Sequence, residues 1–294
     1  MRLNSKHLRI ASNLAPMALT VGLLFAGGML FAVLQSVGWS SVSGENHFTA
    51  RHYDNFVTDA EFKDSLLITF ALASVSTLLS ATTGLLLALS FRRAAQRWRP
   101  VRVLAQVPLA MPHTVMALVV LEFLSPSGIL ARVLSGVGVI HGSEGFPVLT
   151  NDRLGIGIIV AYVLKEAPFV ALMVVAVLLR IGDDYDAVAR TLGASRWNRL
   201  AHVTLPLVAP ALVSSSLVVF AFISGAYEVP FLLGRQYPAM LPVVAQHKFM
   251  DVDLAVRPDA IAIGVIIAIT TAIFVVGYMR LARALSTTER PLIF

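Results

Sequence analysis

Ionisable side chains inside apolar segments are the first candidates for chemistry in this 294-residue chain. Lys165 and Glu166 stand side by side within a long apolar stretch, and Glu122 and Glu228 stand at the ends of two others. A charge at the centre of a membrane-spanning helix costs roughly 2.5–3.5 kcal/mol on insertion scales, so such residues are functional candidates by default. These four residues are therefore the candidates for contact with a solute that crosses the membrane.

The motifs of the common enzyme classes are missing from the sequence. It has no cysteine, which excludes thiolate nucleophiles, disulfides and cysteine-ligated zinc, and its seven histidines form no His-Glu-x-x-His motif. None of its four lysines follows a glycine, so the phosphate-binding P-loop of an ATPase is absent. We therefore expect no catalytic residue, no metal site and no cofactor bound by this chain.

The composition indicates a membrane protein. Hydrophobic residues make up 57% and charged residues 14% of the chain, against about 45–50% and about 25% in an average soluble domain. A soluble fold could not cover that much apolar surface with polar groups. Intrinsic disorder is excluded as well, because disordered chains combine low hydrophobicity with high charge.

Six apolar stretches are long enough to cross a bilayer, which needs about 20 residues of helix. The predicted fold class is therefore all-α, a polytopic membrane protein with six transmembrane helices. Pro108 and Pro112 are expected to kink or delay the third span, and Pro168 to kink the fourth. The expected spans cover roughly 14–38, 65–91, 103–121, 154–179, 200–227 (beginning near Pro206) and 260–279.

The distribution of basic residues predicts the orientation. Most of the 23 lysines and arginines lie in the N-terminal segment, the 92–102 loop, the 180–199 loop and the C-terminal segment. Because cytoplasmic segments carry the excess of basic residues, both termini are predicted to be cytoplasmic, and the net charge of +6 mostly reflects this bias. The basic residues form no continuous stripe, so no nucleic-acid partner is expected.

The cytoplasmic loop 183–206 has the pattern of two short helices joined by a glycine turn. An acidic cap begins a first helix at 184–192, Gly193 permits a sharp turn, and a second helix follows at 194–202. Leu205-Pro206 then restarts the chain into the membrane, since proline is favoured in the first turn of a helix. A paired-helix element of this kind suits a groove on a partner protein.

This loop resembles the EAA loop of permease subunits of binding-protein-dependent ABC importers, which have the MetI-like fold. The family's pattern is Glu-Ala-Ala, three residues, Gly, nine residues, Ile, one residue and Leu-Pro. The chain departs from it at three positions, since Ala187 replaces the glutamate, Val188 the first alanine and Val203 the isoleucine; Asp186 stands one position before Ala187 and partly stands in for the lost acid. The resemblance assigns the ATPase contact to the loop residues Asp186, Ala187, Ala189, Arg190, Gly193, Ala194, Trp197, Val203, Leu205 and Pro206.

The resemblance also implies a mechanism and partners. In the family, the loop sits in a cleft of a cytoplasmic ATPase dimer, whose closure on ATP and Mg switches the membrane bundle between inward- and outward-facing states. This chain would form half of the pathway in a bacterial inner membrane. It would work with a second, identical or related permease and an extracytoplasmic substrate-binding protein. The implied domains are an N-terminal segment with the first span and an outer loop (1–64), the permease domain (65–285) and a cytoplasmic tail (286–294).

The stretch 227–234 resembles the polyamine, sulfate and thiamine branch of these permeases. Within that branch, outer carboxylates such as Glu122 and Glu228 suit a cation, which favours a polyamine as the solute. Two other classes stay open, an intramembrane enzyme that uses Glu122, Glu166 or His113, and a passive channel. Neither requires a paired-helix loop with this spacing, so an importer permease is the leading hypothesis.

Overall fold

The computed structural model describes residues 5–39, 47–58, 60–93, 103–182 and 184–288. Every regular element in these residues is helical, and six helices are long and apolar enough to cross a membrane. The predicted all-α, six-span fold class is therefore confirmed. The described residues fall into two compact units, within 1–60 plus 244–267 and within 61–243 plus 268–294. The predicted domains 1–64, 65–285 and 286–294 stay a prediction.

The first unit contains α1 (Ser5–Ser36) and α2 (Arg51–Thr58), with η4 (Leu254–Val256) and the beginning of α14 (Arg257–Thr288). The apolar part of α1 is not buried anywhere in this chain. Two polar contacts hold α2 in place. The Tyr53 hydroxyl donates to Ser36 at 2.6 Å, and His52 Nδ1 lies 2.6 Å from the Asp259 carboxylate at the beginning of α14.

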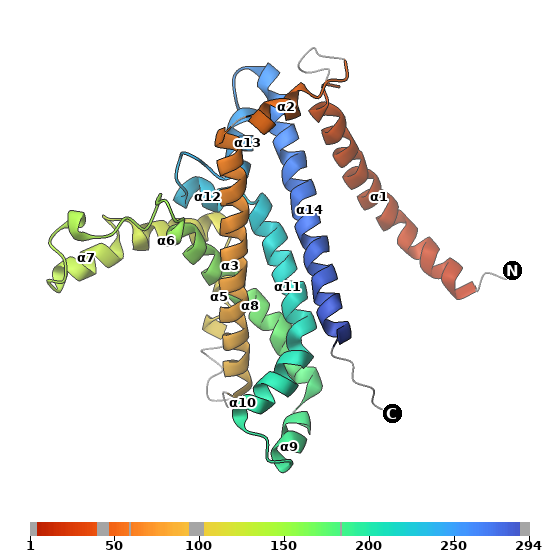
Figure 1. Ribbon diagram of the computed structural model, residues 1–294, viewed down its shortest axis with the longest axis vertical. Coiled ribbons are helices and arrows are strands. Elements are labelled where there is room, and N and C mark those ends of the chain that lie inside the picture. Colours follow the sequence, from red (N-terminus) through yellow and green to blue (C-terminus); the bar gives the residue numbers. More distant parts are fainter. Residues whose placement is uncertain (1–4, 40–46, 59, 94–102, 183, 289–294) are drawn as a thin grey trace. The chain divides into compact units, whose positions relative to one another are not determined.

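The second unit holds most of the helices. Its two longest central helices are α3 (Ala60–Arg93) and α8 (Ile156–Ile181), and α9 and α10 lie at the end of the unit opposite to α12 (Figure 1). The other elements are α5 (Val107–Ala110), α6 (His113–Leu124), α7 (Ile129–Gly136), η2 (Ser143–Gly145), α9 (Asp184–Thr191), α10 (Arg196–Arg199), η3 (Leu200–Thr204), α11 (Leu205–Gly225), α12 (Glu228–Leu233), the beginning of α13 (Leu241–Phe249), whose residues from Val244 on belong to the first unit, and the rest of α14.

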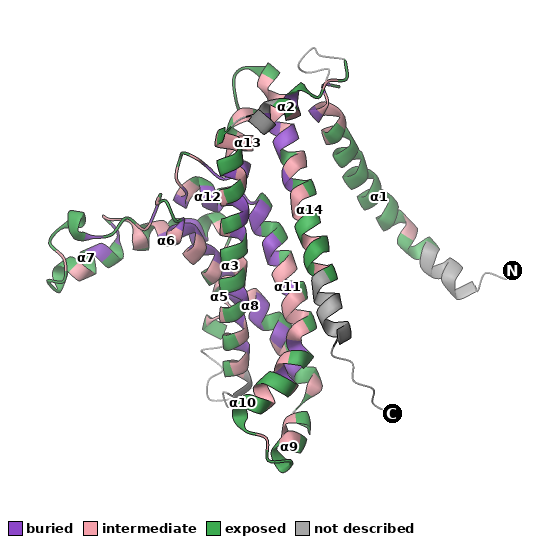
Figure 2. Cartoon of the chain, in the orientation of Figure 1, coloured by how far each residue is buried: buried purple, intermediate pink, exposed green. Residues whose placement is uncertain are grey.

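The buried core of this unit is centred on α8, which packs against α11, α6 and α12 and, on another side, closely against α3 (Figure 2). A Cβ atom on Gly84 would lie 2.7 Å from the Ala167 carbonyl and from Val170, so only glycine lets the two backbones approach. Gly84 belongs to a stripe of small residues at four-residue spacing that also contains Ser76, Ser80 and Ala88, all fully buried. Gly155 at the beginning of α8 meets Leu72 of α3, so the two helices run parallel.

The third span was predicted over 103–121 with a kink or delay at Pro108 and Pro112; the bounds were wrong, because the candidate span covers His113–Gly136, but the expected interruption is present. The structure breaks it, with α5 ending at Ala110 and α6 beginning at His113. Met111 and Pro112 are both extended, with ψ of 136° and 148°. A proline has no N–H to donate and pushes the preceding residue out of the helical region, which explains the break. Pro168, by contrast, lies inside an uninterrupted α8.

The beginning of the fifth span also differs from the prediction. We expected a separate second helix at 194–202 and a restart at Leu205-Pro206, but the chain stays helical from Arg196 to Gly225. The π-helical turn η3 joins α10 to α11, and Pro206 falls in the first turn of α11. Proline lacks the backbone N–H, but the first turn of a helix does not need that donor, so Pro206 does not interrupt the helix. The second, fourth and sixth spans agree with α3, α8 and α14; α3 and α14 extend beyond both predicted ends, while α8 begins and ends two residues later than predicted.

Candidate coupling surface and intramembrane charges

The helical hairpin of α9 and α10 turns at Gly193, as the sequence predicted. Gly193 has a φ of +76°, the left-handed conformation that glycine adopts readily. The Ala194 N–H donates to the Ala189 carbonyl and the Gly193 N–H to the Arg190 carbonyl, each at 3.0 Å, which is the Schellman pattern of a helix end. Asp183, the first residue of the predicted loop 183–206, lies outside the described residues.

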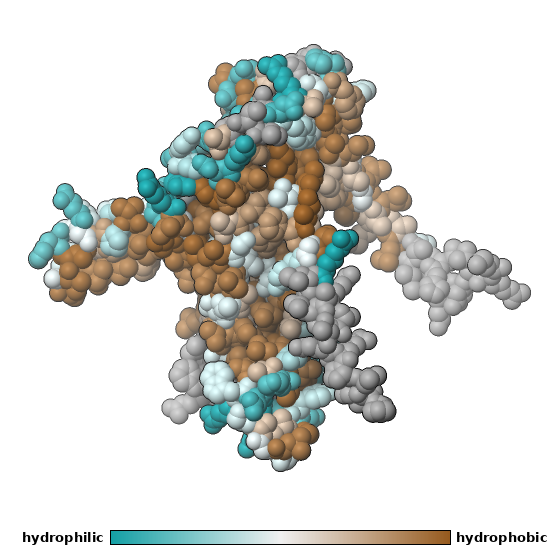
Figure 3. Space-filling view, in the orientation of Figure 1, coloured by the Kyte–Doolittle hydropathy of each residue, from teal (hydrophilic) through white to brown (hydrophobic). Residues whose placement is uncertain are grey.

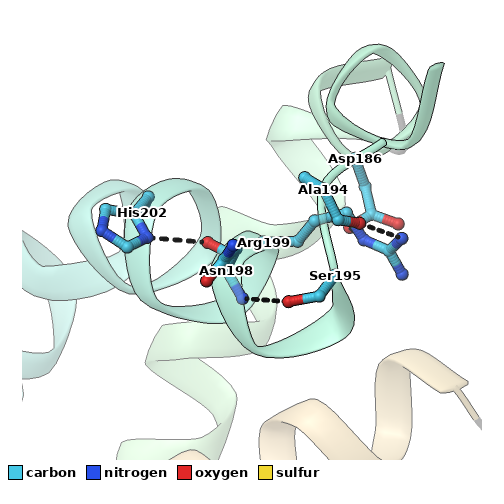
Figure 4. Close-up of polar contacts among 6 residues, drawn as sticks. All are labelled: Asp186, Ala194, Ser195, Asn198, Arg199 and His202. Carbon is cyan, nitrogen blue, oxygen red and sulfur yellow. Dashed lines mark hydrogen bonds and ion pairs between the residues drawn. The ribbon is translucent and has the colours of Figure 1, made fainter. Parts of the chain in front are cut away.

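Polar contacts inside the hairpin fix the angle between its two helices (Figure 4). The Ser195 hydroxyl caps α10 by accepting from the Asn198 N–H at 3.2 Å. The Arg199 guanidinium bridges the two helices, since Nε donates to Asp186 of α9 at 3.0 Å and Nη1 donates to the Ala194 carbonyl at 3.3 Å. Asp186 therefore serves as an internal brace of the hairpin.

The outer side of the hairpin is unusually apolar for a surface. Leu192 and Trp197 are 81% and 77% exposed, and Tyr185 and Val188 are also exposed. We call these four residues the coupling surface. In the space-filling view, apolar atoms gather at the α9 end of the second unit (Figure 3). Large exposed apolar side chains of this kind mark a contact with a partner.

The remaining predicted loop residues divide into two groups. Ala187 and Arg190 are exposed on α9 and Pro206 is exposed at the beginning of α11, while Ala189 and Ala194 are half-buried. Val203 and Leu205 are half-buried too, and Val203 lines a small crevice with Leu178, Tyr185, Asp186 and Leu207, where the hairpin joins α8 and α11. Val203 thus anchors the hairpin to the bundle.

Lys165 and Glu166 are both engaged by the broken third span. The Lys165 ammonium is buried and donates to the Pro108 and Leu109 carbonyls of α5, at 2.8 and 3.0 Å. The Glu166 carboxylate lies 3.0 Å from His113 Nε2, at the first residue of α6. His113 also packs on Phe222 of α11, with ring centroids 4.4 Å apart. The two adjacent charges therefore hold opposite sides of one break.

Glu122 and Glu228 have different surroundings. Glu122 pairs with Arg132 of α7 at 2.8 Å, and both side chains are more than half exposed. Glu228 is exposed at the first residue of α12. Of the two carboxylates on which the expectation of a cationic solute rested, one is therefore already neutralised by an arginine.

Residues 80–290 match the family described as the inner membrane component of binding-protein-dependent transport systems. The chain belongs to this family. It is thus the permease component of a binding-protein-dependent ABC importer, a multi-pass protein of the inner membrane, which confirms the resemblance seen in the loop.

Curated relatives of this permease carry different solutes in their names. It is 27% identical over 261 residues to the molybdenum transport permease ModB of Mycobacterium tuberculosis, covering 87% of this chain and 89% of that one. It is 28% identical over 185 residues to the sulfate transport permease CysT of Escherichia coli, covering 62% and 63%. A permease chain of a bacterial alginate ABC transporter, solved with a periplasmic protein bound to an alginate pentasaccharide, shares the fold with a TM-score of 0.77, at 19% identity and with 98% and 99% coverage.

One further polar residue of the permease was missed by sequence reasoning. Tyr162 of α8 is fully buried, and its hydroxyl has no hydrogen-bond partner among the described residues. It lies about one helical turn before Glu166 in α8. The signal was present in the sequence, because Tyr162 and Glu166 stand four residues apart in one apolar span.

The described part of the permease offers no cluster of His, Asp and Glu that could hold a metal ion. A cavity of about 250 Å³ lies between α3, α11 and the second part of α14, and its walls are mostly apolar. None of the predicted site residues lines it. Its walls include Thr77, Ser216, Phe220, Phe274 and Tyr278.

Proposed function

We propose that the coupling surface of this permease binds a cytoplasmic ABC ATPase and transmits its movements to the membrane helices. The observation that carries the proposal is a rigid, internally braced hairpin that presents Leu192 and Trp197 to the outside at the end of α8 and α11. Because α10 runs without interruption into α11, a displacement of the hairpin moves a membrane span directly. ATP and Mg would be bound by the partner ATPase, since this sequence has no P-loop.

The missing glutamate of the family pattern has a physical replacement within the hairpin. The Asp186 carboxylate accepts a hydrogen bond from Arg199, so Asp186 stiffens the hairpin and does not face the partner. The contact with the ATPase is then chiefly apolar, through the coupling surface, with the exposed Arg190 and Arg196 around it. Apolar anchors surrounded by charged residues are the usual arrangement of a protein interface.

The proposal extends to the orientation of the permease in the membrane and to its partners. The end that carries the hairpin and its arginines is placed in the cytoplasm, together with both termini, in agreement with the excess of basic residues there. The permease would form half of the pathway with a second, identical or related permease. An extracytoplasmic substrate-binding protein would deliver the solute, and the bacterial inner membrane would surround the helices.

Cross-linking tests the proposal. Because the sequence has no cysteine, an introduced cysteine is the only thiol of the permease that can react. Leu192→Cys in the full-length permease should cross-link to the ATPase of the assembled transporter, and ATP should change the yield. In membrane vesicles of known sidedness, a membrane-impermeant thiol reagent should reach this cysteine only from the cytoplasmic side.

The matched control is Tyr237→Cys, an exposed aromatic position in the segment that joins α12 to α13. This cysteine should be labelled from the opposite side and should give no ATPase cross-link. If the Tyr237→Cys variant cross-linked to the ATPase and the Leu192→Cys variant did not, the proposed orientation would be reversed and the coupling role would be wrong.

For the solute, we propose a small oxyanion. The named systems of ModB and CysT handle molybdenum and sulfate, which in water are carried as tetrahedral dianions, and none of the relatives described above is a polyamine permease. The pairing of Glu122 with Arg132 removes part of the reason for a cation. Uptake of radiolabelled sulfate, molybdate and putrescine by cells that express the complete transporter separates the two classes. Uptake of putrescine alone would restore the polyamine interpretation and keep Glu228 as its contact.

A further inference from the structure

The break between α5 and α6 leaves backbone groups that need partners. In a continuous helix, the Pro108 carbonyl would accept the N–H of residue 112, but Pro112 has none, and the only backbone donor left to it among the described residues is the Met111 N–H at 3.3 Å. The extended backbone of Met111 and Pro112 also carries the chain away before the next turn can form. An unsatisfied carbonyl inside a membrane costs several kcal/mol, so a break of this kind persists only where something replaces the lost donors.

Lys165 replaces them. Its ammonium donates to both the Pro108 and the Leu109 carbonyls, and the side chain is only 7% exposed. An ammonium has three donors, and two of them are used on the carbonyl end of α5. The contact joins residues 57 positions apart in the chain, so it also fastens α8 to the third span.

Glu166 holds the other side of the break. Its carboxylate contacts His113, the first residue of α6, where the unpaired N–H groups of the helix give partial positive charge. Phe222 of α11 covers the His113 ring from another direction. The basic residue of the pair thus faces carbonyl oxygens and the acidic residue faces a helix N-terminus, so each charge lies where the backbone dipoles favour it.

We infer that Lys165 and Glu166 are positioning residues that together hold the third span broken at Met111–Pro112, so that the exposed side of the break lines the translocation pathway. Ala110, Pro112 and Thr114 are exposed in the chain. Irregular backbone at membrane depth is stable only against protein or a water-filled cavity, and a pathway supplies the second. This role in the pathway rests on the proposed function, whereas the clamp itself does not.

A double-mutant cycle on the full-length permease tests the clamp by thermal unfolding in detergent. Lys165→Met removes the ammonium donor from both carbonyls and leaves Pro108 with only the Met111 N–H, so it should lower the unfolding midpoint, and Lys165→Gln, which keeps an N–H donor, should lower it less. Pro112→Ala restores an N–H to the Pro108 carbonyl, so adding it should recover most of the loss caused by Lys165→Met. Lys248→Met, at a lysine outside the spans, is the control and should leave the midpoint unchanged.

Strictly additive effects of Lys165→Met and Pro112→Ala would overturn the clamp. If Lys165→Met fails to accumulate in the membrane, the same cycle with Lys165→Gln decides the question. If the ATPase cross-link described above failed, the proposed function would be wrong, but the result of this double-mutant cycle for the clamp would still stand.

Thiol labelling tests the exposed side of the break in the assembled transporter. Thr114→Cys should react with a water-soluble methanethiosulfonate reagent at least about tenfold faster than Leu118→Cys, an exposed position one turn further along α6. Lys165→Gln should change the rate at Thr114→Cys and leave the rate at Leu118→Cys unaltered. Equal rates at both cysteines in the parent background would show that the break does not line a water-filled pathway.

Discussion

The α9–α10 hairpin and the break between α5 and α6 are stabilised by similar contacts in different surroundings. Both are interruptions of helix held by a basic side chain that donates to backbone carbonyls, with a carboxylate that takes part nearby. In the hairpin, Arg199 bonds Asp186 and the Ala194 carbonyl, over at most 13 positions of chain. In the break, Lys165 bonds two carbonyls 57 and 56 positions away, and Glu166 holds the other side.

The difference lies in the surroundings. The hairpin is at an exposed end of the unit, where water can replace any lost contact and where Leu192 and Trp197 are left free for a partner. In the break, the Lys165 ammonium is buried, so water cannot easily replace its two contacts with the carbonyls of α5. Loss of a hairpin contact should therefore act mainly on coupling, and loss of a break contact mainly on stability.

Gly193→Val should give the largest effect on coupling. Nothing lies within 4 Å of a Cβ atom there, so the φ of +76° is the obstacle, and a β-branched residue in that region costs about 1–3 kcal/mol. We expect transport and ATPase coupling to be abolished while insertion into the membrane is kept. Uptake and ATP hydrolysis by the reconstituted transporter measure this. Uptake at the wild-type rate would show that the turn is dispensable. The hairpin would then have no special role in coupling that distinguishes it from the break.

Arg199→Met should have an intermediate effect. It removes the brace to Asp186, a partly exposed ion pair worth about 0.2–1 kcal/mol, so coupling should fall by about two- to fivefold with little change in the unfolding midpoint. The measurement is the stimulation of ATP hydrolysis by the loaded binding protein. Arg196→Met, an exposed arginine on the same short helix, is the control for lost charge. An equal loss in both variants would show that charge matters and the brace does not.

Glu122→Gln should have the smallest effect. Its partner Arg132 is 65% exposed, and such surface pairs contribute about 0–1 kcal/mol. We expect an unfolding midpoint and a maximal uptake rate close to those of the wild type. A strong loss of uptake would return Glu122 to the pathway and would mean that exposed contacts at that end are as critical as the buried break.

The hairpin could be predicted from the sequence because its parts are local. The turn at Gly193 acts through neighbours within a few residues, and the spacing of Gly193 to Leu205-Pro206 also carried the family resemblance. The six spans followed from runs of apolar residues in the same way. What the sequence could not show was that α10 continues into α11, because a single π-helical turn decides whether proline interrupts the helix.

The charged pair in the fourth span shows where sequence reasoning ended. The sequence determined that Lys165 and Glu166 lie in a membrane span and need partners, and it placed Pro108 and Pro112 in the span before. Only the tertiary structure decided that these two features meet, because the packing of α8 against α5 and α6 sets the distances between residues more than 50 positions apart. Since a charge in a membrane is satisfied by whatever the fold brings next to it, its role follows from packing and not from its own position in the chain.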